Sequence, residues 1–259
     1  RSTPKSPFRE CIEAPREPVL SGGGGYFDVL GRRMQAIGNV SALELWSMPL
    51  CLFKDYSIDR ELGTLVKRPW SVTREGGALK EEIFVPLNEE GCVIIYSSDE
   101  PCTINVSLVP VMRHSWPEYS PDVWSPYSPG TEDMSVKIES DRITFTSGEG
   151  KGIIGGDGIS VIDRTGLSVR LDGGEERVVR IATNERTYDA LGDWRSLMEE
   201  TRSYYENFLN SVTTIETPDE GFNEAYLWNL IALDNCYLEK PVFDFVASIF
   251  GAYDADSGR

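Results

Sequence analysis

The chain has 259 residues, and its 42 acidic residues against 25 Lys and Arg leave a formal net charge of −17 at pH 7. This charge argues against nucleic acid and anionic membrane surfaces as partners, because both attract clusters of basic side chains. No apolar run approaches the roughly 20 residues that a membrane-spanning helix needs, so we expect a soluble protein that buries a sizeable core.

The N-terminal segment, residues 1–18, is rich in proline and charge, which is typical of an irregular arm. A run of four glycines follows at 22–25. A phosphate-binding loop would continue with Gly-Lys-Ser/Thr and a helix, and this sequence has neither. We therefore expect a flexible turn or loop here.

From Phe27 to about Thr187 the sequence predicts short strands joined by turns. Residues 42–53 carry little charge, as a buried strand does, and residues 103–112 alternate apolar and polar side chains. Many short strands at hairpin spacing favour a large antiparallel β-sandwich over residues 1–187. Further strands are predicted at 82–87, 92–97, 136–138, 143–145, 159–163, 167–171 and 178–181, with glycine-containing turns at 148–158, 166 and 173–174.

The cysteines and the single histidine indicate no metal site. The cysteines are odd in number and widely spaced, at positions 11, 51, 92, 102 and 236, which fits neither a disulfide framework nor a zinc pattern. Cys51, Cys92 and Cys102 lie in apolar strands and are expected to be small core residues. His114 has no second histidine and no Ser/His/Asp pattern around it, so we interpret it as structural. A reducing cytoplasm is the simplest location.

Residues 150–155 match the pattern GxGxxG. A dinucleotide site needs a helix after these glycines, because its N-terminus holds the pyrophosphate. Here another predicted strand follows, at 159–163. We expect no nucleotide cofactor.

A proline-rich segment at 114–129 holds four aromatic residues. Proline limits the entropy lost on binding, and flat aromatic faces can stack on pyranose rings while carboxylates bind hydroxyl groups. Alternatively, Trp116 and Trp124 are buried under the loop and close the edge of the sandwich. Trp70, which follows Pro69, is a lesser candidate of the same kind. The candidate carbohydrate-binding residues are Trp116, Glu118, Tyr119, Asp122, Trp124 and Tyr127.

Helical periodicity begins near residue 188. Residues 188–210 predict a connecting helix, and a second helix is predicted from Thr217 to Asp234. Thr217 is the expected N-cap, with Pro218 in the first turn and Glu220 completing a capping box. Apolar residues recur at intervals of three and four positions along this second helix, which gives it a face for packing against other helices. The residues assigned to this docking face are Phe222, Tyr226, Trp228, Leu230 and Leu233.

Three segments carry a family resemblance. Residues 217–234, with Thr-Pro-Asp, Asn223, Trp228 and Ala-Leu-Asp, resemble the start of the helical toroid in glycogen-debranching (amylo-α-1,6-glucosidase-like) enzymes. Residues 45–50 (LWSMPL) and 110–117, which end in Trp-Pro, resemble two segments of the sandwich that precedes the toroid in that family. The three matches follow the family's order and span most of the chain.

The resemblance implies a super-sandwich type β domain over 1–187, followed at 188–259 by a linker helix and the first helices of an incomplete (α/α)6 toroid. The family's catalytic carboxylates belong to later toroid helices, so no catalytic residue is assigned here. The resemblance implies that the chain braces a catalytic toroid, present in the same chain or as a separate one, and contacts an α-glucan or oligosaccharide. The alternatives are a free-standing carbohydrate-binding module and a structural protein that docks on a partner through its helices.

Overall fold

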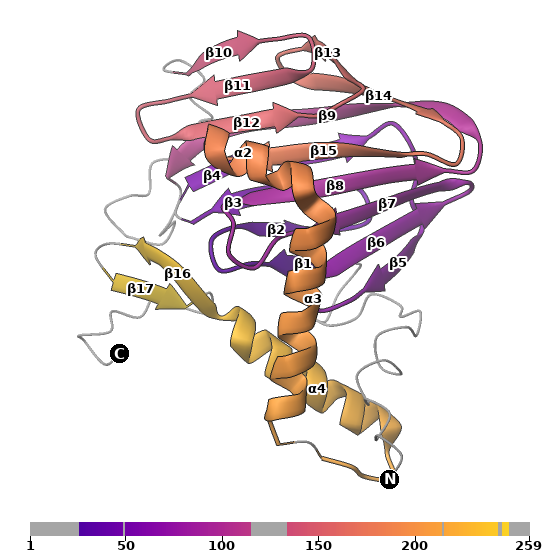
Figure 1. Ribbon diagram of the computed structural model, residues 1–259, viewed down its shortest axis with the longest axis vertical. Helices are drawn as coiled ribbons and strands as arrows, with labels where there is room; N and C mark the ends of the chain where they lie inside the picture. The colour runs from indigo at the N-terminus through magenta and orange to yellow at the C-terminus, as the bar shows by residue number, and fades with distance from the viewer. Residues whose placement is uncertain (1–25, 49, 115–133, 214, 243–244, 249–259) are drawn as a thin grey trace.

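The computed structural model describes residues 26–48, 50–114, 134–213, 215–242 and 245–248. Two antiparallel sheets face each other and form a sandwich (Figure 1), as the sequence predicts. The first sheet has seven strands, in the order β1 (Phe27–Leu30), β2 (Gln35–Gly38), β3 (Leu43–Ser47), β4 (Leu50–Ile58), β9 (Pro101–His114), β14 (Gly166–Asp172) and β13 (Ile159–Asp163).

The second sheet also pairs antiparallel throughout. Its eight strands follow the order β10 (Ser135–Ile138), β11 (Arg142–Thr146), β12 (Lys151–Gly155), β15 (Glu176–Ala182), β8 (Gly91–Ser98), β7 (Leu79–Phe84), β6 (Ser71–Gly76) and β5 (Thr64–Lys67).

The main core fills the space between the sheets. On β9 the alternation predicted from the sequence is confirmed, since Ile104, Val106 and Leu108 are all buried. Phe53 of β4 and Phe145 of β11 meet edge to face across the core, with ring centroids 5.4 Å apart. Apolar burial of this kind is the main source of the free energy of folding.

Two parts of the strand prediction are wrong in detail. Residues 42–53 contribute to two strands, β3 and β4, rather than one, because Ser47 of β3 pairs antiparallel with Leu50 of β4. The glycine-rich stretch expected to be a turn contains strand β12. A Cβ atom at Gly152 would lie 2.9 Å from the Met112 sulfur, and one at Gly155 would overlap the Asp141 carbonyl oxygen. Gly152 therefore permits close packing against β9 of the opposite sheet, and Gly155 against the turn before β11.

A buried polar cluster links the two sheets. Arg74 of β6 donates from Nε to Oε2 of Glu81 on β7 at 2.5 Å, and the two side chains are 1% and 0% exposed. The Tyr96 hydroxyl of β8 donates to the other Glu81 oxygen at 2.9 Å and lies 2.9 Å from the hydroxyl of Tyr56, on the opposite sheet. Burial raises the pKa of both tyrosines well above its usual value.

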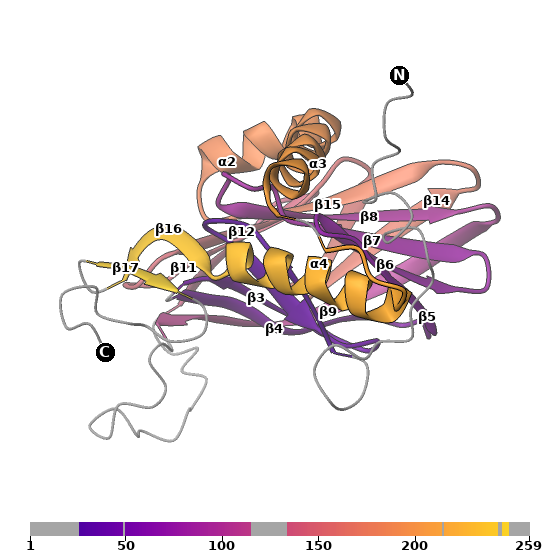
Figure 2. The same cartoon turned by 90° about the horizontal axis from the view of Figure 1, so that it is seen from below.

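Helices follow the last sandwich strand. The helix predicted at 188–210 begins earlier and is interrupted: Asn184 caps α2 (Glu185–Ala190), the short helix η1 (Leu191–Asp193) follows, and α3 runs over Trp194–Ser211. Figures 1 and 2 show α2 and α3 on the outer face of the eight-stranded sheet. The last elements are α4 (Glu220–Asn235) and a hairpin of β16 (Tyr237–Val242) and β17 (Phe245–Ser248).

Helix α4 packs against α3 and lies along the end of the sandwich near β5 (Figure 2). Among the described helices, none is long and apolar enough to cross a membrane.

Candidate functional site

The aromatic segment proposed for carbohydrate binding lies outside the described residues. This applies to Trp116, Glu118, Tyr119, Asp122, Trp124 and Tyr127. Strand β9 leads up to this segment and β10 follows it in the same chain. The role of these six residues stays a prediction.

The start of α4 differs from the predicted capping box. Asp219 is the N-cap, and its carboxylate accepts from the Phe222 N–H at 3.1 Å. The Thr217 hydroxyl accepts instead from the Asp219 N–H at 3.2 Å and donates to Oδ1 of Asn223 at 2.9 Å. Thr217 and Pro218 therefore precede the helix. The carboxylate is the better partner for the positive end of the helix, because it is charged.

The inner face of α4 is buried against its own chain. Leu227, Trp228 and Ile231 are between 3% and 8% exposed, and Lys67 lies over the Trp228 ring, 5.4 Å from its centroid. This face therefore attaches α4 to α3 and to the sandwich. The apolar cluster is made of Trp70, Tyr205, Leu209, Leu227, Trp228 and Ile231.

The outer face of α4 carries two exposed apolar side chains, and Leu230 at its edge also packs against the inner cluster. Phe222 is 53% exposed and Leu233 is 69% exposed, while Tyr226 and Leu230 are half-buried. The Tyr226 hydroxyl donates to the Thr213 carbonyl at 3.0 Å. These four residues recur at three and four positions along the helix, so they form one stripe. We call Phe222, Tyr226, Leu230 and Leu233 the outer stripe; Trp228, assigned from sequence to the same set, lies on the opposite face.

The C-terminal end of α4 is fastened to the sandwich by Arg32, from the β1–β2 turn. Its guanidinium donates to both oxygens of Asp234, at 2.8 and 2.9 Å, and to the Asp234 carbonyl at 2.6 Å. The Tyr204 hydroxyl of α3 donates to the same carboxylate at 2.7 Å. Three elements thus meet at one buried ion pair. The resemblance highlighted Asp234, whereas no local pattern identified Arg32, 202 positions away.

Electrostatics at this junction favour its present protonation state. Burial and the hydrogen bond to Asp234 raise the pKa of Tyr204 to about 12. Burial lowers the pKa of Arg32, but the hydrogen bonds and negative charge of Asp234 outweigh that effect and raise it overall. The Arg32 guanidinium therefore stays charged and the Tyr204 hydroxyl stays neutral across the neutral pH range.

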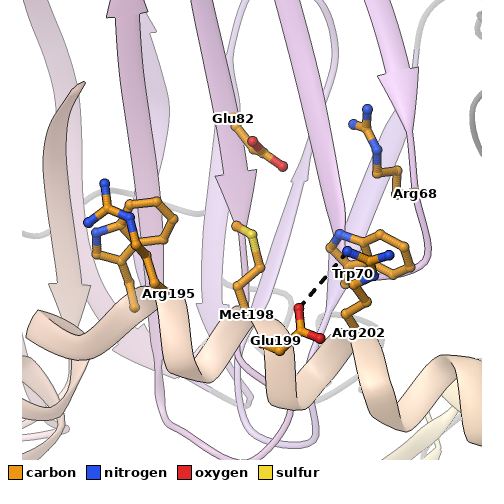
Figure 3. A pocket seen from close by; sticks show the side chains of 8 residues that line it. Arg68, Trp70, Glu82, Arg195, Met198, Glu199 and Arg202 are labelled. Atoms are coloured by element: carbon orange, nitrogen blue, oxygen red, sulfur yellow. Dashed lines mark ion pairs between the residues drawn. The ribbon is translucent and has the colours of Figure 1, made fainter. Parts of the chain in front are cut away.

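A pocket of about 400 Å³ opens between α3 and the eight-stranded sheet. Trp70, predicted as a lesser candidate for sugar binding, lies in its wall and is 9% exposed. Figure 3 shows Glu82 of β7 and Met198 of α3 between Arg195 on one side and Arg68 on the other.

Helix α3 supplies most of the residues that line this pocket, and these residues are spaced three and four positions apart. Trp194, Met198 and Arg202 follow one another at intervals of four, with Arg195 and Glu199 beside them. Arg202 lies over the Trp70 ring at 5.6 Å, and Arg195 lies over the Trp194 ring at 4.3 Å. The periodicity of 194–202 was visible in the sequence, but nothing there indicated the strands that face it.

The described residues contain no group of three or more His, Cys, Asp and Glu side chains placed to hold a metal ion. Cys51 and Cys92 are buried in strands, as predicted, and Cys102 is partly buried. Burial raises the pKa of the Cys92 thiol, so this cysteine is a protonated core residue.

No protein-family model and no curated protein sequence matches the chain. Several solved structures align with much of the chain. A bacterial glucoamylase complexed with acarbose aligns with 86% of this chain and 43% of its own, at 8% identity and a TM-score of 0.48. A family GH92 α-mannosidase from Bacteroides thetaiotaomicron aligns with 81% of this chain and 37% of its own, at 10% identity and a TM-score of 0.42.

An active YidC insertase aligns with 85% of this chain and 52% of its own, at 10% identity and a TM-score of 0.40. The chain thus spans about half or less of the length of these structures. A relation to debranching enzymes rests on the sequence resemblance, and we treat it as a proposal.

Proposed function

We propose that this chain is the non-catalytic β-sandwich portion of a glycoside hydrolase of the glycogen-debranching type. In this proposal residues 1–187 form the bracing domain, and residues 188–259 hold the linker helix and the first helices of an (α/α)6 toroid. The order of the three sequence matches supports it, as does the succession of a sandwich and helices. The observation that carries it is the outer stripe of α4.

A helix that is apolar on two opposite sides is suited to a position between two layers. The inner face of α4 already packs on α3 and Trp70, and the outer stripe leaves Phe222 and Leu233 more than half exposed. Exposed apolar side chains aligned on one helix face are suited to an interaction site. The proposed occupant is a neighbouring helix of the catalytic toroid, in the same polypeptide or in a separate one.

In this arrangement the ion pair of Arg32 with Asp234 has a mechanical role. It holds the end of α4 against the β1–β2 turn and α3, so the sandwich sets the position of the first toroid helix. The catalytic carboxylates would come from later helices. The aromatic residues of 116–127 are proposed to contact an α-glucan or oligosaccharide beside the toroid, and the proposed location is the cytoplasm.

The direct test follows the reading frame past Arg259 in the genome. The proposal requires several hundred helix-rich residues with paired carboxylates, in the same frame or an adjacent one. The purified 259-residue chain should show no glucosidase turnover. Measurable turnover by this chain alone would refute the non-catalytic assignment, and a stop codon without such a frame nearby would favour a free-standing binding or partner-docking protein.

A second test addresses the outer stripe. The helical region found in that frame is expressed separately and mixed with the chain. Phe222→Ser combined with Leu233→Ser should abolish co-elution, whereas Ile162→Ser, at a position on β13 that is 57% exposed, should leave it intact. Equal co-elution of all variants would show that the toroid does not bind this face.

A further inference from the structure

The pocket under α3 carries an inference that is separate from the docking of α4. Its walls come from the outer face of the eight-stranded sheet and from α3, whereas the outer stripe lies on α4. Its volume of about 400 Å³ is in the range of small-molecule sites, which begin near 300 Å³.

The three arginine side chains that line the pocket differ in their ion pairs. Arg195 pairs with Glu176 at 2.5 Å, and Arg202 pairs with Glu206 at 3.0 Å. Arg68 differs from both. Within the described part of the chain its guanidinium forms no ion pair, and its one hydrogen bond goes to the Thr73 hydroxyl at 3.1 Å. A guanidinium has five N–H donors in a planar fork that matches carboxylate or phosphate oxygens.

The rest of the pocket wall suits an uncharged ring that has hydroxyl groups at its rim and an apolar face. Glu82 accepts from the Ser71 hydroxyl at 2.8 Å through one oxygen, and a carboxylate has further lone pairs for hydroxyl donors. Trp70 and Met198 supply apolar surface next to it. Sugar rings present hydroxyl groups at their rim and C–H groups on their faces, so the two kinds of surface fit one ligand.

We propose that this pocket binds an anionic monosaccharide: a pyranose that carries one carboxylate or phosphate. Arg68 holds the anionic group, Glu82 accepts from ring hydroxyls, and Met198 contacts the ring carbons. The carboxylate of a uronic acid and the phosphate of a hexose phosphate share the chemistry that Arg68 recognises, and titration distinguishes them.

The test is isothermal titration calorimetry of the full chain with glucuronate and glucose 1-phosphate. Glucose, acetate and inorganic phosphate serve as part-ligands, because each carries either the sugar ring or an anionic group but not both. At least one of the two sugar anions should bind, at least about tenfold more tightly than any of the three part-ligands, because charge-assisted hydrogen bonds and ring contacts act together. Whichever sugar anion binds more tightly shows whether the pocket prefers the carboxylate of a uronic acid or the phosphate of a hexose phosphate.

Variants locate the binding. Arg68→Gln should weaken it by about tenfold or more, and Arg68→Lys, which keeps the charge, should weaken it less. Arg164→Gln is the matched control, because Arg164 is exposed and lies between β13 and β14 of the other sheet. Circular dichroism and the melting temperature check that each variant folds.

Three results would overturn the proposal. One is the absence of binding by both sugar anions at 10 mM, on the order of the weakest affinities that matter for such ligands. Another is that glucose or inorganic phosphate binds as tightly as the sugar anion. The pocket would then recognise only the sugar ring or only the anionic group. The third is equal binding by a folded Arg68→Gln variant and the wild-type chain.

Discussion

At the scale of single residues, the junction of Arg32, Tyr204 and Asp234 decides where α4 lies. The Arg32 and Asp234 side chains are 8% and 11% exposed, so their charges are shielded from water and depend on each other. The sequence resemblance pointed to Asp234 but not to its partner. Contacts over 202 positions leave no local periodicity, which is why this half of the junction could not be predicted.

Asp234→Asn should therefore destabilise the chain. The substitution removes the charge that Arg32 faces, and loss of one partner of a shielded ion pair costs about 2–3 kcal/mol in the free energy of unfolding. Urea denaturation followed by circular dichroism measures it. Asp172→Asn is the control, because Asp172 is exposed and its loss should cost less than about 0.5 kcal/mol. Equal effects of the two substitutions would contradict the role of the junction.

The buried cluster inside the sandwich gives a second prediction at this scale. Glu81→Gln leaves the Arg74 guanidinium buried without its charge partner, and we expect a loss of about 3–5 kcal/mol. Replacing both residues together, as Arg74→Met with Glu81→Leu, should recover most of this stability, because no isolated charge remains. A double variant as unstable as the single one would mean that packing, and not charge, limits the site.

At the scale of elements, α4 shows what periodicity can and cannot resolve. Apolar residues at spacing three and four predicted a helix at the right place, but they occupy two opposite faces. Sequence grouped Trp228 with Phe222 and Leu233, although Trp228 is 6% exposed and the other two are open. Which face packs inward depends on Tyr205 of the preceding helix and on Trp70, which is distant in sequence. The face could not be chosen from α4 alone.

The two faces of α4 should respond differently to truncation. Trp228→Ala removes a buried indole and should lower the free energy of unfolding by about 3–5 kcal/mol. Leu233→Ala, on the outer stripe, should change it by less than about 0.5 kcal/mol in the isolated chain. Thermal and urea unfolding of both variants measure the contrast. A large loss from Leu233→Ala would mean that the outer stripe is already covered in the isolated protein.

At the scale of the whole molecule, alternation and turn residues predicted the antiparallel sandwich from sequence. The order of strands in each sheet could not be predicted, because strands pair with partners that are not their neighbours in sequence. Strand β9 pairs with β4 and β14, and β8 pairs with β15 as well as β7. The pocket under α3 was missed for the same reason, since Arg68 and Glu82 of its sheet wall are separated from α3 by more than 100 positions. Patterns within one element predict its type and burial, whereas sites between elements depend on the assembled fold.

The assembled fold should also lose stability in alkali. Burial and Asp234 raise the pKa of Tyr204 from 10.0 to about 12, and burial raises the pKa of Tyr56, Tyr96 and Tyr205 as well. Between pH 10 and 12 the unfolded chain releases these protons while the folded chain keeps them. The unfolded state then binds fewer protons, so the free energy of unfolding falls as pH rises through this window.

Urea unfolding at intervals from pH 8 to 12 measures this dependence, and Tyr204→Phe isolates one contribution. Phenylalanine has no proton to release, so the variant should release about one proton fewer on unfolding than the wild type near pH 11, and its stability should fall less steeply there. Tyr226→Phe is the comparison, because Tyr226 lies on the outer stripe, outside the junction. If Tyr204→Phe kept the wild-type slope, the Tyr204 hydroxyl would titrate alike in the folded and unfolded chain, and its hydrogen bond to Asp234 would not hold α4 in solution.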